Sequence, residues 1–132
     1  MTTPRDEGLA VLKEMLPDLF ADHEGDASAS ARPFAPELGD QAMETVFARL
    51  WLRPGLDRRS RSLLTIGMLI GLGSHDELGI HFRIGLNNGL SVEELEEIIY
   101  HASGYAGFPA ASTAAHVARQ ALAVHDTSEQ EA

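Results

Sequence analysis

The sequence has 132 residues, of which 44% are hydrophobic and 23% are charged, which is enough for one folded domain with a buried core. Its formal net charge of −10 argues against nucleic-acid binding, which needs a concentrated basic surface. The absence of cysteine excludes disulfides, thiolate metal sites and cysteine nucleophiles, and it leads us to expect a cytoplasmic protein.

The first part of the chain predicts two helices separated by a connector. Residues 5–21 place leucines on one face, and Pro17 predicts a kink or break within this segment. Residues 23–35 are small, polar and proline-containing, so they predict a flexible connector. A second helix is predicted over residues 37–51, because the sequence Arg-Pro-Gly that follows is a helix stop signal.

The third predicted helix is the most apolar part of the chain. Asp57 is a candidate N-cap, and the helix is expected to run to about Leu72. It is apolar on almost every side, which predicts central burial, but its apolar run from Leu63 is too short to span a membrane. Gly67 and Gly71 are four residues apart, so a second helix can approach closely along this row.

The fourth and fifth predicted helices have capping signals in the sequence. Ser74 is a candidate N-cap for the fourth helix, and Gly89 is its candidate left-handed terminator. Ser91 followed by Glu94 forms a capping box, which predicts a fifth helix through about Tyr105.

The sixth predicted helix is alanine-rich and is expected to run from Pro109 to about Val124. Residues 125–132 are polar and predict a frayed tail. No long segment alternates with period two, so strands are not expected. The sequence therefore predicts an all-α fold of about six helices, in a single domain spanning residues 1–132.

A stretch of polar residues, "GSHDELGIHFR" at residues 73–83, opens the fourth helix. Glu77, His81 and Asn88 should lie on one stripe of it, and a carboxylate beside an imidazole raises the histidine pKa and gives an acid–base group. The alternatives are a surface pair of little consequence or a core histidine. His75 and His81 are six residues apart and lie on different faces, so a metal site is not predicted.

Arginines gather in the sequence "RLWLRPGLDRRSR" at residues 49–61. A local basic patch on an acidic protein suits a small anionic ligand, because arginine binds carboxylates in a bidentate manner. A solvated helix boundary with surface ion pairs is the alternative.

Residues 77–118, "ELGIHFRIGLNNGLSVEELEEIIYHASGYAGFPAASTAAHVA", resemble the carboxymuconolactone decarboxylase family. The sequence "WLRPGLDRRSRSLLTI" at residues 51–66 extends the resemblance, which covers roughly residues 36–122. It implies an alkylhydroperoxidase-D-like helical bundle. In related peroxidases two cysteines precede the histidine, but here those positions are Ser74 and Glu77, so thiol chemistry is not available.

The resemblance implies an enzyme that decarboxylates 4-carboxymuconolactone to 3-oxoadipate enol-lactone, or acts on a closely similar anionic lactone. This reaction belongs to the protocatechuate branch of aromatic catabolism, the β-ketoadipate pathway. It requires no cofactor, because the electrons released with CO2 flow onto the lactone carbonyl. His81 is the candidate oxyanion donor, and His81 or Glu77 is the candidate acid that protonates the ring carbon.

The remaining candidate residues would bind substrate. Arg53 or Arg58 would hold the retained carboxylate, and Trp51 would form part of an apolar wall. His101 and Tyr105 lie four residues apart on the fifth helix and are expected to line the same cavity, as is Asn88.

The resemblance also implies a homotrimer or homohexamer without a resident metal or cofactor. Two other functions stay open on the same scaffold. One is a lactone isomerase, cyclase or tailoring enzyme of secondary metabolism, and the other is a non-catalytic oligomeric module that binds small ligands.

Overall fold

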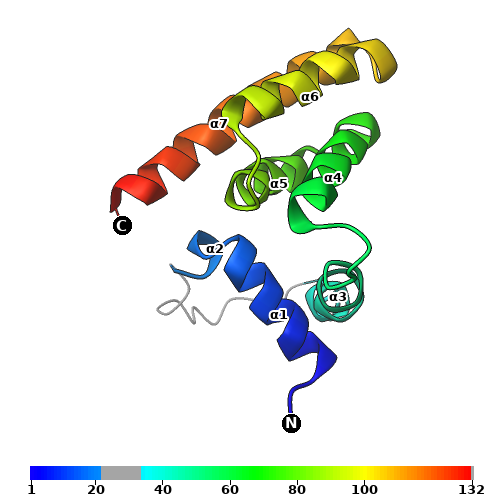
Figure 1. Cartoon of the computed structure of the whole chain (residues 1–132), viewed down its shortest axis with the longest axis vertical. Coiled ribbons are helices and arrows are strands. Elements are labelled where there is room, and N and C mark those ends of the chain that lie inside the picture. The colour runs from blue at the N-terminus through cyan, green and yellow to red at the C-terminus, as the bar shows by residue number, and fades with distance from the viewer. Residues whose placement is uncertain (22–33, 132) are drawn as a thin grey trace. The chain divides into compact units, whose positions relative to one another are not determined.

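The structure is a computed structural model that describes residues 1–21 and 34–131 (Figure 1). Every regular element in these residues is a helix, so the predicted all-α class is confirmed. The chain divides into two compact units, Met1–Leu56 and Asp57–Ala132. That both units form a single domain stays a prediction, as does the flexible connector, most of which lies outside the described residues.

The N-terminal unit contains four helical segments. These are α1 (Pro4–Met15), α2 (Asp18–Ala21), α3 (Leu38–Ala42) and the π-helix η1 (Met43–Leu50). The predicted break at Pro17 is confirmed, because α1 ends just before it. Gly8 of α1 packs against the backbone of Met43, and a Cβ at position 8 would overlap the Met43 carbonyl.

The predicted second helix corresponds to α3 and η1 in succession. From Met43 the backbone forms the wider turns of a π-helix, which change the angular spacing of the side chains. Regular α-helical spacing over residues 37–51 predicts that Val46 and Leu50 point inward with Met43 and Phe47, but this is wrong, since Val46 and Leu50 are exposed.

The C-terminal unit contains four helices. These are α4 (Arg58–Leu72), α5 (His75–Asn87), α6 (Val92–Tyr105) and α7 (Phe108–Glu131). Helices α6 and α7 lie side by side, and α5 contacts both α4 and α7 (Figure 1). Their shared core consists of Ile66, Ile70, Leu78, Phe82, Leu90, Leu95, Ala102, Ala114, Ala118 and Ala121.

Capping signals fix the ends of these helices. The Asp57 carboxylate accepts a hydrogen bond of 2.7 Å from the Ser60 N–H. The capping box is confirmed, because Ser91 and Glu94 each accept a 3.0 Å hydrogen bond from the other's backbone N–H. Gly89 is left-handed with φ of 105°, as predicted. Ser74 occupies the N-cap of α5, but its side chain makes no capping hydrogen bond.

Helix α7 is longer than predicted. It continues through Glu131, so the frayed tail predicted over residues 125–132 is wrong for the described residues. No glycine or proline follows Val124 to stop the helix. His125, which lies in this extension, is buried.

Helix α4 is less buried than predicted. Only Ser62, Ile66 and Ile70 of α4 are buried. The opposite side is apolar and exposed, so the expected central burial is wrong for this chain taken alone; its exposed large residues are Leu63, Leu64, Met68 and Leu72. No helix among the described residues is long and apolar enough to cross a membrane.

Candidate active site

His81 lies next to the core of the C-terminal unit and is, with His125, one of the two buried histidines among the described residues. The exposed fraction of His81 is 7%, and its neighbours in α5, Leu78 and Phe82, are fully buried. Burial penalises the charged imidazolium and lowers the pKa of His81 to about 4. The expectation of a raised pKa is therefore wrong, and the imidazole is neutral at pH 7.

Glu77 lies one turn before His81 but in a different environment. It is exposed and makes no hydrogen bond or ion pair with any described residue. It lines an open pocket of about 500 Å³ at the start of α5, and His81 is not among the lining residues. Glu77 and His81 lie on the same face of α5, but the predicted pair forms no hydrogen bond or ion pair. Helical spacing determines on which side of the helix a side chain lies, but it does not determine how deeply that side chain is buried.

Asn88 connects the end of α5 to α4. Its side-chain Nδ2 donates a 3.0 Å hydrogen bond to the Oγ of Ser62, which is fully buried. Its backbone N–H closes α5 by donating to the Ile84 carbonyl. The Asn88 side chain therefore fixes the position of the helix that carries His81; its contact with substrate stays a prediction.

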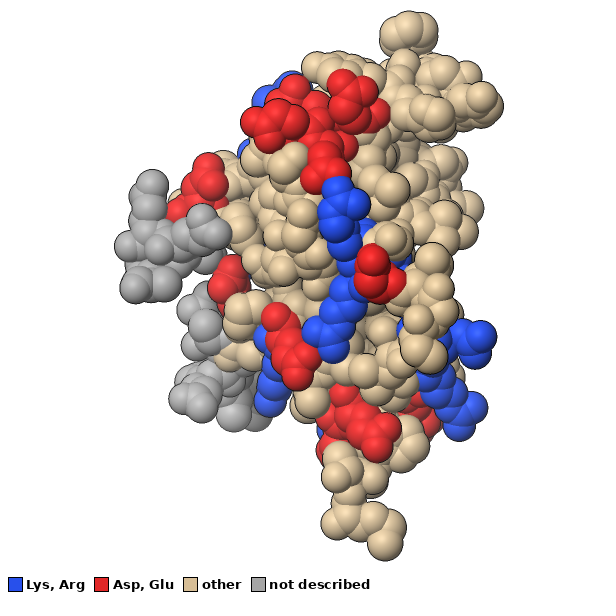
Figure 2. All heavy atoms as spheres, in the orientation of Figure 1, with Lys and Arg blue, Asp and Glu red and all other residues tan. Residues whose placement is uncertain are grey.

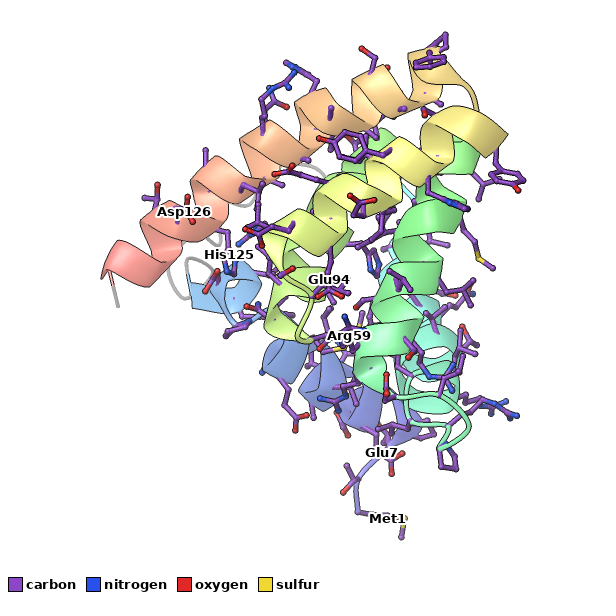
Figure 3. All side chains as sticks on the ribbon, turned by 45° about the horizontal axis from the view of Figure 1, so that its top comes forward. Met1, Glu7, Arg59, Glu94, His125 and Asp126 are labelled. Carbon is purple, nitrogen blue, oxygen red and sulfur yellow. The ribbon has the colours of Figure 1, made fainter. Side chains whose placement is uncertain are left out.

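The arginines near the start of α4 have different surroundings. Arg59 forms an ion pair with Glu94 at the start of α6, and the two side chains point toward one another (Figure 3). Arg58 is partly buried in the first turn of α4. Arg59 is thus occupied by a structural contact, and binding of an anion by Arg58 stays a prediction.

Trp51 and Arg53 belong to the N-terminal unit. Trp51 is 5% exposed and stacks on Phe47, with ring centroids 6.4 Å apart and an interplanar angle of 15°. Arg53 follows it and is exposed. Trp51 is therefore a packed aromatic residue, and its predicted role as a substrate wall stays a prediction.

His101 and Tyr105 line a separate groove. Their rings stack with centroids 5.0 Å apart, and they border a groove of about 750 Å³ between α4 and α6. Neither Glu77 nor His81 lines this groove, so the structure does not bring the two residue pairs into one cavity. The i,i+4 spacing correctly predicts that His101 and Tyr105 are neighbours.

Two further features were not predicted from the sequence. One is a pocket of about 370 Å³ between α5 and α7, which includes Arg83 and Gln120. The other is the Arg59–Glu94 ion pair, which joins residues with no local sequence signal between them. Among the described residues, no three histidine, aspartate or glutamate side chains gather as a metal ion would require.

The sequence profile of the carboxymuconolactone decarboxylase family matches residues 36–120. This chain belongs to that family. It is 38% identical over 114 residues to 4-carboxymuconolactone decarboxylase of Acinetobacter baylyi, which covers 86% of this chain and 83% of the relative. It is 37% identical over 117 residues to nitrosuccinic acid decarboxylase npaB of Metarhizium robertsii, covering 89% of this chain and 80% of the relative.

Membership of the carboxymuconolactone decarboxylase family confirms the resemblance inferred from the sequence motifs. Both of these relatives are named as decarboxylases, and the chain contains no cysteine. The prediction of a carboxy-lyase rather than a thiol peroxidase is therefore confirmed. The names of the relatives refer to two different acids, so they do not define the substrate of this chain.

Proposed function

We propose that the protein decarboxylates a small dicarboxylic acid that carries its own electron acceptor, with 4-carboxymuconolactone as the first candidate. The near-equal similarity to two decarboxylases named for different acids carries this proposal. Each acid has one carboxylate that leaves, a group that receives the electron pair, and a second carboxylate that is retained. This shared chemistry defines the substrate class more broadly than either name.

The acceptor differs between the two acids, but its role is the same. In 4-carboxymuconolactone the electron pair of the breaking carbon–carboxylate bond moves through the ring double bond onto the lactone carbonyl oxygen. In nitrosuccinate it moves onto the nitro group attached to the same carbon. In both cases negative charge develops on oxygen, and a proton from the protein or solvent then adds to carbon. In the lactone this carbon is the ring carbon next to the carbonyl, so the ring double bond shifts to give the enol-lactone; in nitrosuccinate it is the carbon that lost CO2.

His81 fits the stabilisation of that oxygen. With its pKa lowered to about 4, the imidazole is neutral at pH 7 and donates a hydrogen bond through one N–H. A fixed donor in a water-poor position is effective because it needs no reorganisation as charge develops. We assign the oxyanion contact to His81 for this reason.

Protonation of carbon needs a different group, because a neutral imidazole is a weak acid. Glu77 lies one turn before His81 on the same face of α5 and is open to solvent, so it is suited to relay a proton. Arg58 or Arg53 would bind the retained carboxylate, with Trp51 as apolar wall. The predicted cytoplasmic location and homotrimeric or homohexameric assembly are part of this proposal.

The proposal is tested by incubating the purified protein separately with 4-carboxymuconolactone, nitrosuccinate and succinate. Release of CO2 and the product formed would be followed by gas analysis and NMR. We expect turnover of at least one of the two activated acids and none of succinate, which lacks an acceptor. Binding of either acid without CO2 release would instead indicate the non-catalytic module, and conversion of the lactone with its carboxylate retained would indicate an isomerase.

A second candidate function is decarboxylation of nitrosuccinate itself. It is favoured by the 37% identity to the nitrosuccinic acid decarboxylase, which extends over 89% of this chain. The same assay distinguishes the two candidate functions, because the preferred substrate is the acid that is decarboxylated with the higher kcat/KM.

A further inference from the structure

A pocket of about 360 Å³ lies between α6 and α7. Its floor is apolar, because Leu95 and Ala118 line it and are buried members of the core. Ile99 and Leu122 also line the pocket and are partly buried. Small-molecule sites are typically concave, roughly 300–1,000 Å³ in volume, and mostly apolar with a few polar groups. The pocket therefore has the size and the floor of a site for a small molecule with an apolar part.

This pocket is separate from the candidate active site. Every residue that lines it belongs to α6 or α7, and neither His81 nor Glu77 is among them. His101 and Tyr105, which border the groove between α4 and α6, do not line it either. A molecule bound between α6 and α7 is therefore a second ligand, out of contact with the imidazole to which we assign the oxyanion contact.

Two exposed side chains of opposite charge line the pocket, Glu96 of α6 and Arg119 of α7. Neither forms an ion pair with any described residue, so they do not pair with each other. Arg119 is also the only lysine or arginine in the sequences of α6 and α7. One positive and one negative group thus border the same apolar floor without neutralising each other.

The charges around the pocket favour a ligand that carries both signs. The Glu96 carboxylate accepts a hydrogen bond of 3.4 Å from the Tyr100 hydroxyl, and a carboxylate can accept several more. Acidic side chains gather over α6 near the top of Figure 2, and the helix contains three glutamates besides Glu96. A ligand with only a carboxylate would meet this negative charge, whereas a ligand with only an ammonium group would meet Arg119.

We propose that the pocket between α6 and α7 binds an apolar α-amino acid. Arg119 holds the carboxylate of this ligand in a bidentate contact, and Glu96 accepts hydrogen bonds from its ammonium group. Both groups are attached to one carbon, so the ligand bridges two side chains that do not contact each other. Its apolar side chain lies against Ile99 and Leu122, where it is removed from water. This proposal concerns a second ligand and does not rest on the identity of the substrate.

The first test compares L-phenylalanine with 3-phenylpropanoate and phenethylammonium, which each lack one of its two charges. Binding is measured in 0.15 M salt (about physiological ionic strength) from the rise in melting temperature with ligand concentration, because a ligand that binds only the folded chain stabilises it. We expect phenylalanine to bind about tenfold or more tightly than either analogue. The proposal is overturned if phenylalanine gives no stabilisation or if either analogue binds as tightly.

The second test removes the charges of the protein one at a time. Arg119→Gln should reduce the affinity for phenylalanine to that for phenethylammonium, without weakening the binding of phenethylammonium. Glu96→Gln should reduce it to that for 3-phenylpropanoate, without weakening the binding of 3-phenylpropanoate. The matched control is Glu93→Gln, at an exposed glutamate of α6 that does not line the pocket. Phenylalanine binding that is unchanged in Arg119→Gln and Glu96→Gln would overturn the proposal.

The third test locates the ligand. Ala115 lines the pocket and is partly buried, so Ala115→Phe should fill the pocket and abolish binding of phenylalanine. Ala123→Phe places the same ring at an exposed position of α7 outside the pocket and should leave binding unchanged. NMR should show nuclear Overhauser effects from the ligand ring to the methyl groups of Ile99 and Leu122, which decides the location if Ala115→Phe does not fold. Such effects to methyl groups of α4 or α5 alone would place the ligand elsewhere and overturn the proposal.

Discussion

Helices α4 and α5 lie against each other in the C-terminal unit, yet each contains side chains whose burial does not match their polarity. Helix α4 is apolar on almost every side and exposes Leu64, Met68 and Leu72. Helix α5 begins with polar residues and buries His81. Burial of a side chain is therefore decided by which surface faces it, and that surface can belong to another molecule or to a catalytic site.

The exposed apolar side chains of α4 and the buried histidine of α5 have different chemical consequences. An exposed leucine costs hydrophobic free energy until a partner covers it, so it indicates an interaction surface. A buried histidine loses its charge, so it indicates a group whose protonation state has been selected. The predictions below test these two readings from the largest expected effect to the smallest.

The largest effect on stability should come from the core that α5 shares with its neighbours. Phe82 is fully buried, so Phe82→Ala should lower the free energy of unfolding by about 3–5 kcal/mol through lost burial and a cavity. Leu64→Ala on the exposed side of α4 should cost less than about 1 kcal/mol. Urea unfolding at a dilution where the protein is monomeric measures both, and equal losses would mean that Leu64 is buried within the chain.

Removal of the buried imidazole should have the largest effect on catalysis. His81→Leu keeps an apolar side chain of similar bulk but removes the hydrogen-bond donor, so kcat should fall about 100- to 1000-fold. Glu77→Gln should reduce kcat by about tenfold or more through the loss of the proton relay. Steady-state kinetics on the confirmed substrate measure both; activity retained in His81→Leu would disprove the assignment.

The pH dependence of stability should report the same histidine. The pKa of His81 falls from 6.5 to about 4 on folding, so the unfolded chain binds more protons between these values. Stability is then full above about pH 6.5 and falls as the pH is lowered toward 4, with His81 contributing about 3 kcal/mol of the loss.

This contribution is isolated by comparing wild-type protein with His81→Leu in urea unfolding at pH 7 and pH 4.5. The loss on acidification should be smaller in the variant. His75→Gln replaces an exposed histidine in the first turn of α5 and serves as the matched control. An equal acid-dependent loss in wild-type protein and in His81→Leu would assign the effect to other groups.

The smallest effects should come from single methyl groups on glycines. A Cβ at Gly85 in α5 would lie 3.0 Å from Ile66 and 3.1 Å from Leu90, so Gly85→Ala should destabilise the protein by about 1 kcal/mol or more. Gly67 in α4 has open space, so Gly67→Ala should stabilise the dissociated chain by about 0.5–1 kcal/mol. The melting temperatures measured by thermal unfolding should therefore shift in opposite directions, down for Gly85→Ala and up for Gly67→Ala, if Gly85 is tightly packed and Gly67 is not.

Local sequence signals predicted the ends of α4 and α6 and the class of the fold. The Asp57 cap and the Ser91–Glu94 capping box act over three residues, so they are readable without the tertiary structure. The π-turns of η1 and the exposed side of α4 depend on packing, and the sequence patterns did not reveal them. The length of α7 was missed although no glycine or proline follows Val124 to stop the helix. The family motifs extend over most of the chain, and several of them occur in the correct order, which is why the family could be identified from the sequence.

The candidate site was predicted only in part for the same reason. Helical spacing placed Glu77 and His81 on one face of α5, but it did not determine that one is exposed and the other buried. It also paired His101 with Tyr105, but it could not show that this pair lines a groove apart from His81. Depth and shared cavities are tertiary properties, and an i,i+4 pattern contains no information on them.

The buried, neutral state of His81 is tested most directly by NMR titration of the histidine rings, with the His81 resonance assigned by its loss in His81→Leu. The sequence has six histidines, so the spectrum is simple enough to assign. We predict that the His81 ring stays unprotonated down to about pH 5 and titrates near its pKa of about 4. A His81 ring that titrates at or above 6.5 would contradict both its burial and its role as a neutral hydrogen-bond donor.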